Sequence, residues 1–82
     1  MANKKHPDRD KFEAELEELN KLDVPADYAT IVRHTRPDIP KRLLYDVRHG
    51  NTTDLAVLAE IRRVTRERAA ANIIYAQTAV AA

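Results

Sequence analysis

The chain has 82 residues, a formal net charge of +1 and no cysteine. This length fits one domain, and the lack of cysteine excludes disulfides and thiolate metal sites. No apolar run is long enough to cross a bilayer, and none follows the basic N-terminal residues. We therefore expect a cytoplasmic protein without a membrane span or a secretion signal.

The composition predicts an all-α fold. There is one glycine, aromatic residues make up 5% of the chain, and alanine, leucine, arginine and glutamate, which favour helix, are abundant. A β-rich fold would need more turn glycines and more aromatic or β-branched residues. We expect a single domain, residues 1–82, built as a compact bundle of four or five helices, with residues 1–6 disordered.

The first predicted helix begins at Pro7 and ends before Asp23-Val24-Pro25, because the residue before a proline is pushed out of the α region. Its apolar residues recur at offsets of three and four, which is the stripe of an amphipathic helix. They are Phe12, Leu16, Leu19 and Leu22. Glutamates occupy the opposite face.

Two short helices are predicted next, over residues 25–35 and 40–49. Pro37 and Pro40 bracket residues 36–39 and predict a tight turn there, with Pro40 at the first helical position. Gly50 predicts a helix stop in the left-handed conformation that glycine tolerates best.

A loop over residues 51–53 supplies an N-cap for a fourth helix that starts at Asp54. From residue 54 to residue 78 the helix would be about 37 Å long, which exceeds the width of so small a globule, so we expect it either to break or to reach beyond its own core. A break is plausible over residues 65–68, where the apolar stripe lapses, with residues 66–82 as the C-terminal helix. Ile73, Ile74 and Tyr75 form an apolar cluster in this alanine-rich segment. We expect the cluster to be buried, in a two-fold symmetric homodimer or else against the first helix.

Charge is unevenly distributed along the chain. Residues 1–23 hold five basic and seven acidic side chains, whereas residues 24–82 hold nine basic and six acidic ones. Between residues 33 and 50, five basic residues accompany only two acidic ones. This local excess is a plausible footprint for nucleic acid, although an ordinary solvated face has the same composition.

The segment around residues 39–50 resembles the phage repressor and Cro type of helix-turn-helix. In that family a turn with an apolar residue leads into a helix with two inward apolar residues three apart, followed by a glycine, a loop and a leucine-bearing helix. Ile39, Leu44, Val47 and Gly50 match those positions, and Leu55, Leu58, Ile61 and Val64 match the packing face of the following helix. The resemblance covers residues 26–64. The family usually has glycine at the turn, at the position held here by Asp38.

The resemblance implies a DNA-binding protein whose helix over residues 40–49 reads the major groove of double-stranded DNA. The candidates for base contacts are Lys41, Arg42, Tyr45 and Asp46. Lysine and arginine pair with guanine acceptors, Tyr45 suits a thymine methyl or a phosphate, and Asp46 is placed to orient Arg42 or to accept from cytosine. The alternative without DNA binding is that Lys41 and Arg42 only aid solubility and that Tyr45 belongs to the core.

Five further residues are candidates for phosphate contacts, which position a protein without reading sequence. They are Arg33, Arg36, Arg48, His49 and Asn51. No catalytic, metal or cofactor constellation emerges, since the three histidines are scattered and no phosphate loop is possible with one glycine. The alternative is a helical interaction module, an adaptor or antitoxin-like protein, that contacts a partner protein through Tyr45 and the Ile73–Tyr75 cluster.

Overall fold

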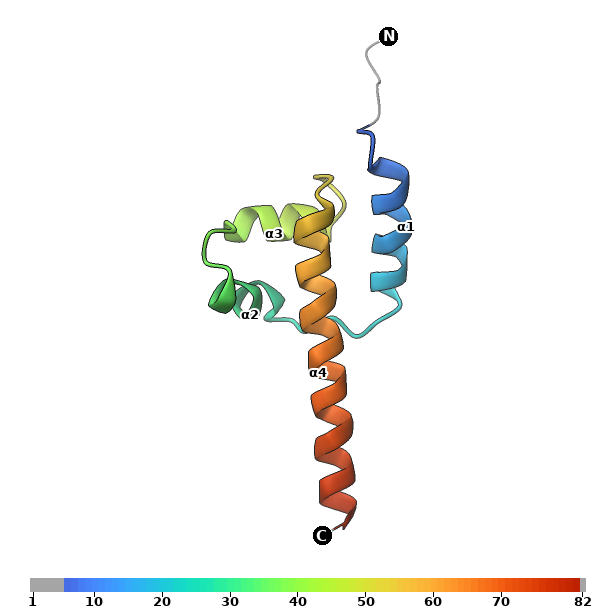
Figure 1. Cartoon of the computed structure of the whole chain (residues 1–82), viewed down its shortest axis with the longest axis vertical. Coiled ribbons are helices and arrows are strands. Elements are labelled where there is room, and N and C mark those ends of the chain that lie inside the picture. Colours follow the sequence, from blue (N-terminus) through green and yellow to red (C-terminus); the bar gives the residue numbers. More distant parts are fainter. Residues whose placement is uncertain (1–5, 82) are drawn as a thin grey trace.

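The computed structural model describes the backbone of residues 6–81 and the side chains of residues 6–71. These residues form four helices and no strand. The helices are α1 (Arg9–Asn20), α2 (Tyr28–Thr35), α3 (Lys41–Arg48) and α4 (Leu55–Ala81). Helix α4 is central to the fold: α2 and α3 lie along one side of it and α1 along the other (Figure 1). The all-α prediction is confirmed. The predictions for residues 1–5 and for the Ile73–Tyr75 cluster lie outside the described residues and side chains.

Buried apolar side chains from all four helices form one core. Phe12 and Leu19 of α1 are fully buried, as the stripe predicts, and Leu16 is half-buried. Leu22 was expected on the same stripe but is 42% exposed. The reason is that α1 ends at Asn20, where the N–H groups of Lys21 and Leu22 bond three residues back and tighten the last turn. The complete core comprises Phe12, Leu19, Tyr28, Ala29, Val32, Ile39, Leu44, Val47, Val57, Leu58, Ile61 and Val64.

The helix starts differ from prediction by one to three residues. Helix α2 begins at Tyr28 rather than at Pro25, and α3 begins at Lys41. Pro40 is extended, with ψ at 142°, and serves as the residue before the helix, its carbonyl accepting the N–H of Leu44 at 3.2 Å. Asp54 likewise precedes α4, and its Oδ1 accepts the N–H of Val57 at 3.1 Å. Asp54 is therefore itself the N-cap of α4, whereas the cap was expected one residue or more earlier, from the loop over residues 51–53.

The connection between α2 and α3 is the expected tight turn, closed by the N–H of Ile39 donating to the carbonyl of Arg36 at 3.2 Å. No residue except Gly50 has a positive φ in the described part of the chain. Asp38 therefore adopts an ordinary right-handed conformation, and this turn does not need the glycine usual in the resembled family.

Of the two alternatives for the last helix, the break is wrong and the unbroken helix is confirmed, because α4 runs from Leu55 to Ala81 and reaches beyond the other three helices (Figure 1). Neither proline nor glycine occurs in that range, and the lapse of the apolar stripe marks where packing ends rather than where helix ends. Arg63 and Glu67 form an ion pair across the expected break, at 2.9 Å. Within the part of the chain that the structure describes, no helix is both long and apolar enough to cross a membrane.

Candidate nucleic-acid interface

Helix α3 is held by one face. Leu44 and Val47 are fully buried and Ile39, in the preceding turn, is 6% exposed, as the sequence predicts. Helix α3 packs on both α2 and α4 through this face. Two anchors on a helix of eight residues, with a third in the turn before it, fix its rotation about its own axis, so the side of α3 opposite Leu44 and Val47 points outward.

The outward residues at the start of α3 are Lys41, Arg42 and Tyr45, all exposed. The Lys41 ammonium lies 5.7 Å from the centre of the Tyr45 ring, within range of a cation–π contact. Tyr45 is 40% exposed, one of the two large hydrophobic residues left exposed among the described side chains. Two cations and an aromatic ring thus share one exposed helix surface.

Asp46 stands apart from this group. It is half-buried, and no ion pair joins it to Arg42 among the described side chains. Its backbone carbonyl accepts the N–H groups of Asn51 at 2.8 Å and Thr52 at 3.3 Å, which closes the end of α3. The expected role of Asp46 in orienting Arg42 is absent in this structure.

Tyr28, the first residue of α2, supports Tyr45 from beneath. The two rings meet edge to face, with centroids 5.9 Å apart and planes at 79°. Tyr28 is 7% exposed, and its hydroxyl is buried without a hydrogen-bond partner among the described residues. Burial raises the pKa of this phenol, and the nearby Arg48 charge opposes the shift. Sequence reasoning counted Tyr28 only as an apolar residue of α2, because nothing in the spacing links it to Tyr45.

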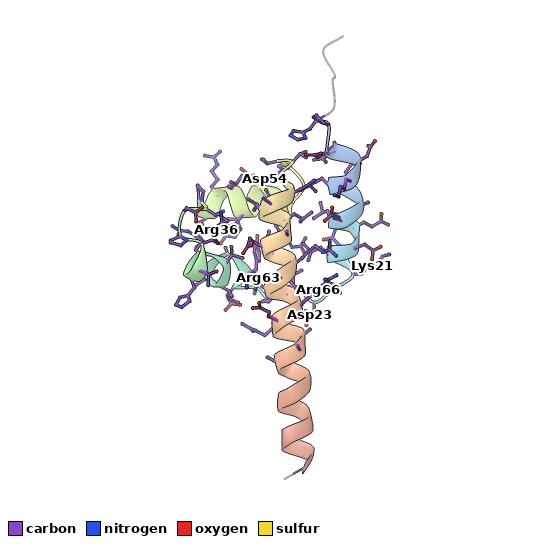
Figure 2. All side chains as sticks on the ribbon, in the orientation of Figure 1. Lys21, Asp23, Arg36, Asp54, Arg63 and Arg66 are labelled. Carbon is purple, nitrogen blue, oxygen red and sulfur yellow. The ribbon has the colours of Figure 1, made fainter. Side chains whose placement is uncertain are left out.

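Two of the predicted phosphate contacts lie near the start of α3. Arg33 donates from Nε to the carbonyl of Ile39 at 3.0 Å. Arg36 grips Asp38 with two nitrogens, each at 3.0 Å, and lies at the outer end of the α2–α3 connection (Figure 2). The hydrogen bond between them lowers the pKa of Asp38 and raises that of Arg36.

The other predicted phosphate contacts lie at the end of α3. Arg48 donates to Oδ1 of Asn20 at 2.6 Å and so ties α3 to the end of α1. His49 Nδ1 lies 2.8 Å from the carbonyl of Tyr45, within its own helix. Asn51 is exposed in the loop that follows. The five residues therefore form two groups, one at each end of α3, rather than one cluster.

A residue that the sequence did not single out, Arg9 of α1, fastens the loop after α3. Its guanidinium donates to the carbonyl of Gly50 at 2.9 Å and to the hydroxyl of Thr53 at 3.1 Å, while lying 5.3 Å from the Phe12 ring centre. Gly50 itself has φ at +81°, and a Cβ there would lie 3.2 Å from Leu16 Cδ2. Glycine is therefore required by its conformation and by the close approach of α1.

Neither a protein-family model, nor a curated protein, nor a solved structure matches this chain.

Proposed function

We propose that this chain is a sequence-specific DNA-binding protein of the helix-turn-helix kind, a small transcriptional regulator that reads the major groove with α3. The observation that carries the proposal is the outward row of Lys41, Arg42 and Tyr45 on a helix fixed by Leu44 and Val47 on its other side. A major groove admits one α-helix, and a reading helix needs a rigid base together with side chains that reach base edges.

The chemistry of the outward row suits DNA. Lysine and arginine donate to the N7 and O6 acceptors of guanine, which is the commonest specific contact. Arg42 has no ion-pair partner among the described side chains, so its planar fork is available for such a bidentate contact. Tyr45 offers a ring edge for a thymine methyl and a hydroxyl for a phosphate.

The three arginines near the ends of α3 differ in how many of their nitrogens remain available to contact phosphates. Arg33 and Arg48 each use one nitrogen in the intramolecular hydrogen bonds described above, which leaves donors over. Arg36 is held by Asp38 through two nitrogens. We therefore expect Arg33 and Arg48 to contribute more to binding than Arg36, through contacts that position the protein on DNA.

The test is a salt titration of binding to random-sequence duplex DNA. Neutralised phosphates release counterions, so the logarithm of the affinity should fall linearly with the logarithm of salt concentration, by about 0.9 per phosphate. Arg42→Ala should cost about 1–3 kcal/mol on a selected site and relax the preference at one or two base positions. The matched control is Lys11→Ala, because Lys11 is an exposed cation on α1 whose loss also removes one charge.

The result separates this proposal from the alternative. Equal effects of Arg42→Ala and Lys11→Ala would leave only non-specific attraction, and affinity independent of salt would contradict DNA binding altogether. An adaptor or antitoxin-like protein that uses Tyr45 to contact a partner protein would give that second outcome, with Tyr45→Ala still weakening its complex.

A further inference from the structure

The second half of α4 extends beyond the rest of the molecule. Helix α4 has 27 residues and is about 40 Å long at the usual rise per residue. Among the side chains that the structure describes, its last buried residues are Val64 and Thr65, and its last ion pair with another segment joins Arg68 to Asp27 at 3.7 Å. Beyond this point the helix projects away from α1, α2 and α3 (Figure 1).

The projecting segment has an unusual composition for a helix in water. Residues 69–81 include no charged residue, and the first three, Ala69 to Ala71, are exposed. A separate helix of this length is marginal in water even when rich in alanine. A solvated helix surface also normally carries charge. This segment therefore calls for a partner along its length.

The first half of α4 has a matching surface. An open hollow of about 350 Å³ lies on its surface, just before the projecting segment. Figure 2 labels two of the residues around it, Arg63 and Arg66. Its lining residues are Ala59, Arg62, Arg63, Arg66 and Glu67. Alanine and the methylene stems of arginine give such a hollow an apolar floor beneath its charged rim.

The charges around the hollow largely cancel within the chain. Arg62 pairs with Glu15 at 3.0 Å. Arg63 pairs with Glu60 at 3.0 Å and with Glu67 at 2.9 Å. Arg66 has no ion pair among the described side chains, but the three arginines of the lining are balanced by the three glutamates Glu15, Glu60 and Glu67. The hollow therefore favours neither an acidic nor a basic partner, and an uncharged helix suits it.

We infer that α4 pairs antiparallel with α4 of a second copy of this chain, with the two-fold axis at the level of residue 68, the midpoint of the helix. Residues 69–77 of each copy then lie opposite residues 59–67 of the other. Because both the uncharged segment and the hollow lie on one helix, on either side of its midpoint, a single two-fold axis covers both features in both copies.

The helical register supports this pairing. Positions 59 and 77 are about five turns apart and so share one face of α4. The same face carries positions 59, 63, 66, 70, 73 and 77. Rotation about residue 68 sets Ala59 against position 77, Arg63 against position 73 and Arg66 against Ala70. Two of these pairs join a small residue to a longer one, which is how antiparallel helices interdigitate.

The test uses introduced cysteines, which are the only thiols because the chain has none of its own. The axes of packed helices lie about 8–10 Å apart, and each Cα lies about 2.3 Å from its own axis. Directly facing Cα atoms are therefore close enough for a disulfide. The double variant Ala59→Cys/Gln77→Cys should form a covalent dimer on mild oxidation, with each single variant remaining uncrosslinked. The single variants thus serve as matched controls.

Light scattering on the unmodified full-length chain, without DNA, should give the mass of a dimer at tens of micromolar. A monomer at that concentration overturns the inference, and the partner of residues 69–81 would then be another molecule. A dimer in which Gln77→Cys alone crosslinks efficiently overturns the antiparallel arrangement in favour of a parallel one. Neither result depends on DNA, so the inference and the proposed function can fail separately.

Discussion

Truncation of Leu44 and of its neighbour Tyr45 should affect stability and DNA binding in opposite order. Leu44 is fully buried, and Leu44→Ala should lower the free energy of unfolding by about 2–5 kcal/mol, from lost transfer energy and the cavity left behind. Tyr45 is 40% exposed and contributes mainly its edge-to-face contact with Tyr28, so Tyr45→Ala should cost about 0.5–1.5 kcal/mol. In DNA binding the order should reverse, with Tyr45→Ala weakening the complex of a protein that remains folded.

The assay is urea unfolding followed by circular dichroism, with the two variants as mutual controls because both place alanine in the same helical turn. A domain of this size has roughly 4–12 kcal/mol of stability in total, so Leu44→Ala removes a large share. With a slope of about 1 kcal/mol per molar urea, the midpoint should fall by roughly 2–5 M for Leu44→Ala and by about 1 M for Tyr45→Ala. A larger loss for Tyr45→Ala than for Leu44→Ala would show that α3 is rotated about its axis, and the outward row would then be misassigned.

Substitutions at three other positions test the supports of this helix. Gly50→Ala should destabilise the fold by about 1–3 kcal/mol in thermal melts, because φ is +81° and the added Cβ meets Leu16 at 3.2 Å. Gly50→Asn should lose less stability, because asparagine tolerates this conformation better than alanine; an equal loss would show that the contact with Leu16 dominates. Arg9→Lys should cost about 1–3 kcal/mol despite keeping the charge, since Arg9 bonds Glu13 through Nε and both Gly50 and Thr53 through Nη1, and an ammonium has only one nitrogen; an unchanged melting temperature would contradict this role. Tyr28→Phe should leave stability at neutral pH unchanged or raise it by up to about 1 kcal/mol, because an unpartnered buried hydroxyl is removed. Burial raises the pKa of Tyr28, so the unfolded chain ionises first, and stability should fall as the pH rises above about 10 in the unmodified protein more than in the variant.

The local features of the fold were accessible from the sequence. Apolar spacing identified the anchors Leu44 and Val47, and the lone glycine identified a left-handed stop at Gly50. These features depend on residues within a turn or two of one another, and apolar residues at offsets of three and four indicate them directly. The false break in α4 arose from reading the end of packing as the end of the helix. The helix continues past the end of packing because residues 69–71 are alanine, the best helix former.

The tertiary features of the candidate site were not accessible in this way. The contact between Arg48 and Asn20 joins residues 28 positions apart, and that between Arg9 and Gly50 joins residues 41 apart. Neither pair has a spacing or composition that marks it in a single sequence. A list of basic residues therefore identified cations near α3 without indicating which of them the fold already occupies.

The position of α1 has a consequence for how the molecule opens. Helices α2, α3 and α4 contact one another pairwise, whereas α1 packs on α4 and is fastened at its ends by Arg9 and by the bond between Asn20 and Arg48. Such an arrangement divides the protein into a three-helix unit and a docked helix, and units of this kind open separately under native conditions. Amide protons of α1 should then exchange with solvent sooner than those around Leu58 and Ile61, through an excursion in which α1 detaches while α3 stays in place. The release of Arg48 from Asn20 and of Arg62 from Glu15 in that open form would give the three-helix unit two more free guanidiniums than the closed molecule has.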